Sequence, residues 1–262
     1  MTAGSGTNRP DYGLDAPGVV RNLVLVAAAG LTIWLTSAFG WWSGRIVVGQ
    51  VRIALAGSVV WPAISCALMA VWMAWHSRIG KIRGRERLLD LVPWTGTEQV
   101  LDVGCGRGLM LIGAAKRLAS GRAIGVDIWQ AEDLSGNKPE ATLLNAELEG
   151  VRDRVEVRTA DMRQLPFADR TFDTVVSSAA IHNLYAAGDR AKAINEIARV
   201  LEPGGRAVID DIRHLREFQR LFEAAGCAVS RRGSKITTAL LAVITFGSLR
   251  PGTIVVRKSG GR

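Results

Sequence analysis

The chain has 262 residues, with 33 lysines and arginines against 24 aspartates and glutamates, which gives a formal net charge of +9. The charge is uneven: residues 1–90 carry +5, residues 91–223 carry −3 and residues 224–262 carry +7. A slightly acidic centre between basic flanks argues against a nucleic-acid partner and fits an anionic lipid surface. The three cysteines are far apart in the sequence, so neither a disulfide framework nor a metal site is expected.

Two uncharged apolar runs dominate the N-terminal part of the chain. Residues 1–18 are polar and contain glycine and proline, a composition that predicts disorder. Residues 22–44 and 53–75 then hold no charged side chain over 23 positions each. About 20 residues suffice for a helix to cross the hydrocarbon core of a bilayer. We therefore expect a transmembrane helical hairpin over residues 19–77.

The flanks of these runs predict their orientation. A basic juxtamembrane linker at residues 78–92 follows the second run, and such clusters stay cytoplasmic. Both termini would then lie inside, which predicts an integral protein of the cell inner membrane with residues 93–262 facing the cytoplasm. Two alternatives remain open: a cleaved signal peptide, although Trp41 and Trp42 stand where small residues are needed, and a pair of buried core helices.

A glycine-rich turn opens the second half of the chain. The apolar segment Gln99–Val103 reads as a buried strand and runs into Gly104–Gly108, after which a helical pattern begins. Strand, glycine turn and helix together indicate the start of a nucleotide-binding βαβ unit. Position 109 is Leu109 rather than the third glycine of the pyrophosphate fingerprint, and Asp102 precedes the turn. This acid suits a ligand that bears an amine and a sulfonium.

Further strands and helices alternate after this turn, which predicts an α/β fold. Asp127 ends the next strand, 19 residues beyond Gly108, at the spacing expected of a carboxylate that binds both ribose hydroxyls. A helix is expected over residues 141–148, and an amphipathic helix is expected to end at Pro203–Gly205. The other expected strands are residues 123–126, 155–158, 172–178 and 207–209.

Five sequence segments in this order resemble a known family. They are VLDVGCGRG, GVD, ADMRQLPF, FDTVVSS and EIARVLEPGG, and they lie within residues 100–211. They are similar to the class I S-adenosylmethionine-dependent methyltransferases of the ubiquinone/menaquinone-methylase-like group (methyltransferase type 11). The resemblance implies a seven-stranded Rossmann-like sheet with helices on both faces and an antiparallel last strand. Residues 227–232 and 253–258 would supply its sixth and seventh strands.

The same resemblance implies S-adenosyl-L-methionine as the cofactor. Asp102 would lie near its amine, Asp127 would bind the ribose hydroxyls, and Asp161 would accept the adenine amino hydrogen. The alternative interpretation makes these acids solvated loop residues. A polar insertion at residues 129–140 departs from the family pattern and leaves the role of Ile128 open. The full set of implied cofactor residues is Asp102, Gly104, Cys105, Gly106, Asp127, Ile128, Asp161, Met162 and Ser178.

The methyl acceptor would sit beyond the ends of the fourth and fifth strands. There the sequence offers His182 as a base or orienting residue. The alternative is that these polar residues cap the helices that follow. The full set of acceptor-side candidates is His182, Asn183, Tyr185, Asp211 and His214.

The acceptor itself is open at this point. We expect a small or amphiphilic molecule, such as a lipid or an isoprenoid quinone, with membrane lipid as a partner. The alternatives are a soluble thiol or amine acceptor, or a membrane-anchored cofactor-binding module without turnover. Residues 236–247 form an apolar segment with basic edges that either contacts the membrane interface or closes the acceptor pocket. The oligomeric state is not predicted.

Overall fold

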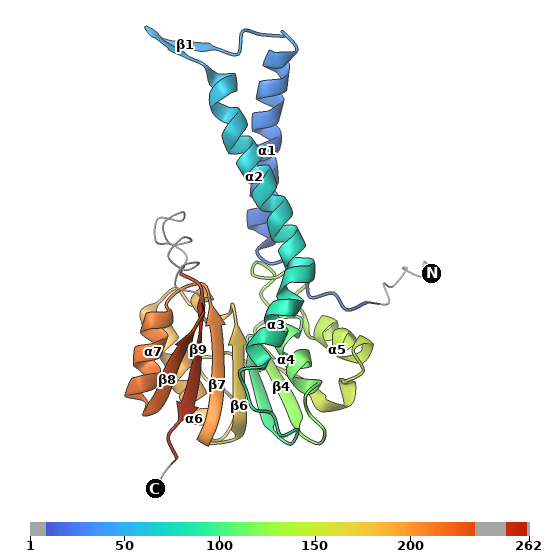
Figure 1. Cartoon of the computed structure of the whole chain (residues 1–262), viewed down its shortest axis with the longest axis vertical. Helices are drawn as coiled ribbons and strands as arrows, with labels where there is room; N and C mark the ends of the chain where they lie inside the picture. The colour runs from blue at the N-terminus through green and yellow to red at the C-terminus, as the bar shows by residue number, and fades with distance from the viewer. Residues whose placement is uncertain (1–8, 234–249, 261–262) are drawn as a thin grey trace. The chain divides into compact units, whose positions relative to one another are not determined.

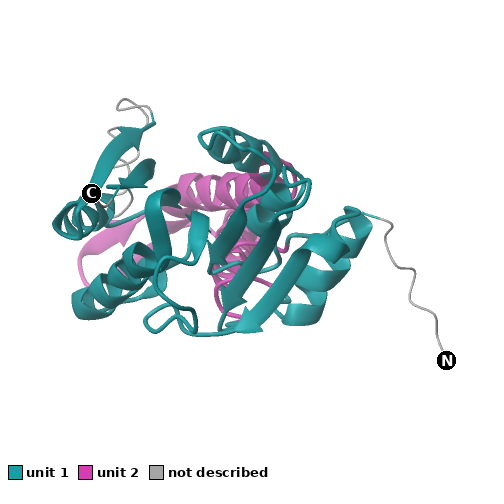
Figure 2. Cartoon of the chain, turned by 90° about the horizontal axis from the view of Figure 1, so that it is seen from below, with its two compact units in different colours: residues 1–12, 82–130, 136–262 teal, residues 13–81, 131–135 magenta. Residues whose placement is uncertain are grey.

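The computed structural model describes residues 9–233 and 250–260, so the apolar segment 236–247 lies outside the described residues. The chain forms two compact units, shown in different colours in Figure 2. Residues 1–12, 82–130 and 136–262 make up the α/β unit. Residues 13–81, together with the short segment 131–135, make up the hairpin unit.

The hairpin unit consists of two long helices that run side by side (Figure 1). Helix α1 spans Pro17–Ala38 and helix α2 spans Leu55–Trp75. Two short strands, β1 (Ile46–Val48) and β2 (Val51–Ile53), pair antiparallel between them. Both helices are long and apolar enough to cross a membrane by length and composition. The two-helix prediction is therefore confirmed as helical structure, while the strand pair was not predicted.

The two helices touch through small side chains. Gly30 of α1 faces Ala63 of α2 so closely that a Cβ added to Gly30 would lie 2.7 Å from that of Ala63. Ala56, Ala63 and Ala70 are all buried and follow one another at intervals of seven residues, which places them along one face of α2. Small residues at such an interface let two helix backbones approach closely.

Polar groups tie the start of α1 to the end of the hairpin unit. The Lys81 ammonium lies 3.1 Å from the Asp15 carboxylate and donates to the backbone oxygen of Gly13 at 2.8 Å. Ser77, in the π-helical turn η1 (His76–Gly80) that follows α2, donates to the same carboxylate at 3.0 Å. The expectation of disorder up to residue 18 is therefore wrong for residues 9–18, because specific hydrogen bonds hold this segment and α1 has begun by Pro17.

The α/β unit is built on one seven-stranded sheet (Figure 1). The strand order is β5-β4-β3-β6-β7-β9-β8, and β9 alone runs antiparallel to its neighbours. This confirms the expected Rossmann-like sheet with its antiparallel last strand. The strands are β3 (Gln99–Val103), β4 (Arg122–Asp127), β5 (Val155–Thr159), β6 (Phe172–Ser178), β7 (Leu201–Asp211), β8 (Cys227–Arg232) and β9 (Gly252–Lys258).

Helices cover both faces of this sheet because successive strand residues point to opposite sides. Leu101 and Val175 pack with α6 and α7 on one face, whereas Val100 and Val176 pack with α3 and α4 on the other. The helices are α3 (Lys81–Leu89), α4 (Leu109–Ala115), α5 (Pro139–Leu148), α6 (Ala187–Val200) and α7 (Leu215–Ala224), with short helical turns η2 (Arg152–Arg154) and η3 (Ile181–Asn183).

The strand order reverses direction between β3 and β6. From β3 the chain moves to β4 on one side and later returns to β6 on the other. In such sheets ligands bind beyond the carboxyl ends of the strands at this reversal. The glycine-rich turn after β3 and the segment after β6 both lie at that edge, which places the candidate cofactor and acceptor residues together.

Candidate functional site

The glycine-rich turn takes backbone conformations that other residues avoid. Gly104 and Gly106 have φ angles of 75° and 51°, in the left-handed region. A Cβ at Gly104 would also collide with the side chain of Ala180, which follows β6. The turn therefore needs glycine at both positions for its conformation, and at Gly104 also for the close approach of two strand ends.

Asp102 is a buried carboxylate within β3, with 1% of its surface exposed. Neither of its oxygens makes a hydrogen bond of ordinary geometry. Burial raises the pKa of Asp102 to about 8, and the nearby charge of Asp127 adds to the rise. An unsatisfied buried carboxylate is costly, so a cationic ligand group at this place would relieve that cost. The amine and sulfonium of S-adenosylmethionine meet this requirement.

Asp127 is held in place at the end of β4 by three donors. Gly106 donates its backbone N–H to Oδ2 at 2.8 Å, and Trp129 donates its own to Oδ1 at 2.6 Å. The Asn137 amide adds a longer bond of 3.3 Å to Oδ1. The carboxylate is thereby oriented before any ligand arrives, and it links the glycine turn to the polar insertion after β4.

Two buried polar residues of α5 support the turn from behind. Thr142 donates to the backbone oxygen of Gly106 at 2.7 Å, and Asn145 donates to that of Arg107 at 2.9 Å. Both side chains are at most 2% exposed. Neither residue was predicted from the sequence, although their spacing of three places both on one face of the helix beside Ala141 and Ala146.

The residues expected around adenine differ in their surroundings. Ile128 is 47% exposed and is open to contact a ligand. Asp161 forms an ion pair with the Arg163 guanidinium, whose nearest nitrogen lies 2.6 Å from Oδ2. This ion pair lowers the pKa of Asp161. Met162 lies close to Gly104, and Ser178 ends β6 half-buried. Cys105 is buried against Gly125 rather than open to a ligand.

On the acceptor side the structure brings His182 and Asp211 together. Nδ1 of His182 lies 2.6 Å from Oδ1 of Asp211, and the backbone N–H of His182 donates to Oδ2 at 3.2 Å. His182 belongs to η3, which follows β6, and Asp211 ends the adjacent strand β7. Asp211 is 2% exposed and accepts a second hydrogen bond from the Ile212 backbone. The two side chains thus form an imidazole–carboxylate dyad in close contact, although the contact at Nδ1 does not have hydrogen-bond geometry.

The other acceptor-side candidates do not join this dyad. Tyr185 is 96% exposed. His214 stands before α7 with a φ angle of 60°, and its Nδ1 lies 3.4 Å from the Glu217 carboxylate. Asn183 lies in η3 beside His182. Asp210 accepts a hydrogen bond from Thr253 at 2.6 Å, and the N-cap position of α7 is His214.

Comparison with known proteins identifies this part of the chain. Residues 101–209 match the sequence family described as "Methyltransferase domain". The match indicates that these residues form a methyltransferase domain. Methyltransferase GfsG of Streptomyces halstedii is 35% identical over 130 residues, which cover 50% of this chain and 43% of the relative. Demethylmenaquinone methyltransferase of Lactiplantibacillus plantarum is 37% identical over 125 residues, which cover 47% of this chain and 49% of the relative.

A solved structure supports the fold of the methyltransferase domain. Geranyl diphosphate methyltransferase in complex with S-adenosylmethionine superposes with a TM-score of 0.52 at 20% identity, covering 68% of this chain and 84% of that one. At this identity the likeness shows the fold alone. The chain spans less than half the length of the two curated relatives.

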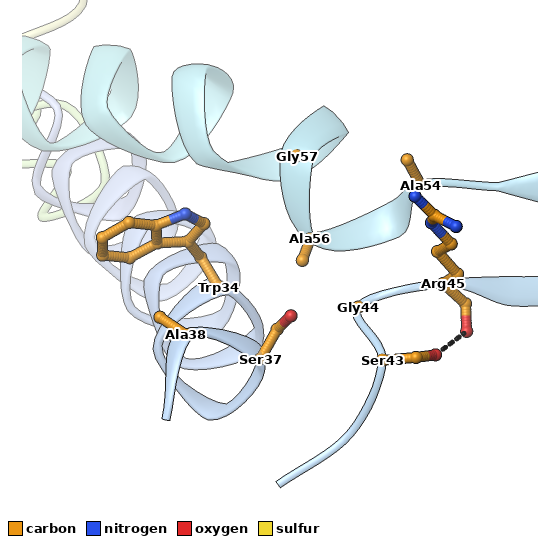
Figure 3. A pocket seen from close by; sticks show the side chains of 9 residues that line it. All are labelled: Trp34, Ser37, Ala38, Ser43, Gly44, Arg45, Ala54, Ala56 and Gly57. Carbon is orange, nitrogen blue, oxygen red and sulfur yellow. Dashed lines mark hydrogen bonds between the residues drawn. The ribbon is translucent and has the colours of Figure 1, made fainter. Parts of the chain in front are cut away.

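Two hollows lie away from these methyltransferase residues. One, of about 250 Å³, lies in the hairpin unit near Trp34, Ser37 and Arg45 (Figure 3). The other, of about 320 Å³, lies on the sheet face between Arg206, Arg232 and Arg257. Neither contains a candidate cofactor or acceptor residue. Within the described ranges, no group of His, Cys, Asp and Glu could hold a metal ion.

Proposed function

We propose that this protein is a membrane-anchored methyltransferase that uses the His182–Asp211 dyad to deprotonate an amphiphilic acceptor. The observation that carries the proposal is the 2.6 Å contact between His182 and Asp211 at the sheet edge that also holds the glycine turn. A dyad of this kind is needed when the acceptor must lose a proton as it is methylated. A thiolate or a neutral amine acceptor has less need of it.

The carboxylate decides which nitrogen of His182 takes the proton. Asp211 lies against Nδ1 and favours a proton there, so Nε2 is left to act as the base. S-adenosylmethionine, when bound, supplies an electrophilic methyl group and departs as S-adenosylhomocysteine. The acceptor loses its proton to Nε2 of His182, which passes it on to water. Asp211 stabilises the imidazolium that exists between these two transfers.

The hairpin unit supports an acceptor that resides in a membrane. Its helices bury only small side chains, whereas large apolar residues face outward: Trp61, Leu68 and Val71 are 72%, 66% and 68% exposed. A soluble helix pair would bury such residues, because each contributes about 1.5–3 kcal/mol when removed from water. Hydrocarbon lipid offers the same gain to side chains that point outward. One relative is named demethylmenaquinone methyltransferase, which makes a quinone one candidate for such an acceptor.

The acceptor class is tested with full-length protein in liposomes. Labelled S-adenosylmethionine is supplied together with either a membrane lipid and quinone extract or a set of water-soluble thiols and amines. We expect label in the organic extract with the natural protein, and its loss with His182→Ala. Label in the soluble acceptors at an equal rate for both proteins would instead favour the second candidate function, a methyltransferase for soluble thiols or amines.

The membrane topology is tested separately by labelling single cysteines in a cysteine-free background. A cysteine placed at Gln50, in the turn between β1 and β2, should react with an impermeant reagent in intact cells. A cysteine at Gly260 should react only after the cells are opened, because the basic flank after α2 keeps that end inside. The reverse pattern would refute the orientation, and a protein recovered without detergent would refute the anchor.

A further inference from the structure

A short segment that precedes the hydrophobic hairpin is docked on the methyltransferase domain. Asp11 and Tyr12 belong to the α/β unit, although 69 residues separate them from its next part at Ile82 (Figure 2). The Asn145 side chain clamps the backbone of Asp11 from both sides: it accepts the Asp11 N–H at 2.9 Å and donates to the Asp11 oxygen at 2.9 Å. Such a two-way bond fixes both the position and the direction of the segment.

Tyr12 anchors the segment in the core. Its side chain is 5% exposed and belongs to the same hydrophobic cluster as α4. The hydroxyl donates to Glu149 at 2.8 Å and accepts from Arg85 at 3.2 Å, so the buried polar end is satisfied. Burial and the bond to Glu149 raise the pKa of Tyr12, which keeps the hydroxyl protonated and able to donate.

The docked segment reaches the cofactor site through Arg107. The Asp11 carboxylate lies 3.1 Å from the guanidinium of Arg107, which is part of the glycine-rich turn. Asn145, which clamps Asp11, also bonds the backbone oxygen of Arg107. On its other side the Arg107 guanidinium lies against Gly136. The next residue, Asn137, donates to the Asp127 carboxylate.

These contacts form one continuous chain from the N-terminal segment to the ribose-binding carboxylate. We propose that Asp11 and Tyr12 act as a strap that positions the glycine-rich turn and Asp127 for S-adenosylmethionine. Cofactor affinity would then depend on a segment outside the family motif. The alternative is that the strap only stabilises the fold. The proposal rests on the cofactor site and is independent of the acceptor and of the membrane.

The structure offers a matched control for testing the strap. Asp11 pairs with Arg107, and the two side chains are 66% and 16% exposed. Asp90 pairs with Arg117 at 2.7 Å, and these side chains are 68% and 17% exposed, but this pair touches no cofactor residue. The variants Asp11→Ala and Asp90→Ala therefore remove carboxylates of similar exposure from the same unit of the full-length protein, and Arg117 keeps a second partner in Glu86 at 2.9 Å.

Four quantities are measured for each variant in detergent: S-adenosylhomocysteine affinity by calorimetry, the thermal midpoint, kcat, and KM for the cofactor. Asp11→Ala should weaken S-adenosylhomocysteine binding about 2- to 5-fold, the range expected for one exposed ion pair. The double variant Asp11→Ala/Tyr12→Ala should weaken it about 10-fold or more. KM for the cofactor should rise in parallel while kcat at saturation stays within about twofold, and Asp11→Glu should recover most of the affinity. Asp90→Ala should leave the affinity unchanged.

Two results would contradict the proposed positioning role of the strap. One is equal S-adenosylhomocysteine affinity for Asp11→Ala and Asp90→Ala at measurable folding of both, because a purely structural ion pair predicts that outcome. The other is a loss of thermal stability in the double variant with unchanged affinity. If the double variant does not fold, Asp11→Ala and Tyr12→Phe still decide the matter, because they keep the Tyr12 ring and the backbone clamp. Since the readout is cofactor binding, a wrong acceptor assignment leaves it unaffected.

Discussion

The α/β unit and the hairpin unit bury opposite kinds of side chain. The core of the α/β unit is made of large residues, with Phe172, Phe218 and Phe222 all fully buried. The contact between α1 and α2 is made of glycine and alanine, while Trp61 and Leu68 point outward. Both units are rich in apolar residues, so composition alone does not separate them.

This contrast in packing indicates a different surrounding medium for each unit. In water, the removal of large apolar surface drives packing, so large side chains collect inside. Between helices in lipid this force is absent, and close approach through small residues provides the contact. The inverted pattern of the hairpin unit is therefore the strongest physical argument for the proposed anchor, beyond the length of its helices.

The first prediction compares the loss of a large side chain from the core of the α/β unit with the loss of one from the outer face of the hairpin unit. Phe222→Ala should lower the free energy of unfolding of the α/β unit by about 3–5 kcal/mol, because it leaves a cavity in a packed core. Trp61→Ala removes a side chain of similar size from the outer face of α2 and should cost at most about 0.5 kcal/mol in detergent. Denaturant unfolding followed separately in each unit measures both. Equal costs would show that Trp61 is packed against protein.

A second effect concerns the pH dependence of the α/β unit. The pKa of Asp102 is raised to about 8 in the folded state, against about 4 for an unperturbed aspartate. Between these values the folded state holds a proton that the unfolded chain has released, so stability falls as pH rises. The slope is at most about 1.4 kcal/mol per pH unit.

Asp102→Asn should flatten this dependence of the ligand-free protein, because it removes the titrating group while keeping its shape. The measurement is the thermal midpoint of both proteins between about pH 6.5 and 8.5. The predicted spans of the hairpin unit, residues 22–44 and 53–75, hold no charged residue and should contribute nothing. Parallel curves for the natural protein and the variant would contradict the assignment to Asp102.

A third effect separates chemistry from anchoring. His182→Ala should lower kcat by about 10²-fold or more while leaving cofactor affinity and membrane insertion unchanged, because it removes the proposed base. Asp211→Asn should lower kcat less, through loss of the group that orients His182. His214→Ala is the control, since His214 pairs with Glu217, and it should change kcat by less than about threefold. A similar loss in both histidine variants would disfavour the dyad.

The smallest effect is expected in the hairpin unit. Gly30→Val should force α1 away from Ala63 of α2 and destabilise their contact by about 1–3 kcal/mol. Protease resistance of the hairpin in micelles measures this change. Cofactor affinity should stay the same, because no cofactor candidate lies in the hairpin unit. Gly57→Val, at a position with open space, is the matched control and should leave the protease resistance unchanged.

Some strands of the sheet were predicted from the sequence with their observed bounds, and one was not. The strand over residues 99–103 and the strand over 172–178 were predicted with their observed bounds, because both are short apolar runs next to recognisable turns. The fifth strand of the expected sheet, β7, begins at Leu201 rather than near Ala207. The Pro203–Gly205 segment predicted that the strand begins after it, but Leu201 already pairs with Phe172 of β6.

The candidate site was likewise predicted only in part from the sequence. The glycine turn, Asp102 and Asp127 follow one another at family spacing, so the sequence alone pointed to S-adenosylmethionine. Only the folded structure shows that His182 contacts Asp211 and that His214 does not join them, because His182 and Asp211 lie 29 positions apart in the sequence. The turn from β7 into α7 directs His214 to Glu217 instead.

Features that depend on local order could be predicted from the amino-acid sequence: the apolar runs, the strand–turn–helix unit and the alternation that makes an α/β sheet. Contacts between segments that are distant along the chain became visible only in the folded structure. The docking of Asp11 and Tyr12 on α5 is one, since a polar N-terminal segment carries no local signal of its partner. The outward-facing surface of the hairpin is another. Local patterns show which residues are apolar, but only packing shows which of them a neighbouring helix covers.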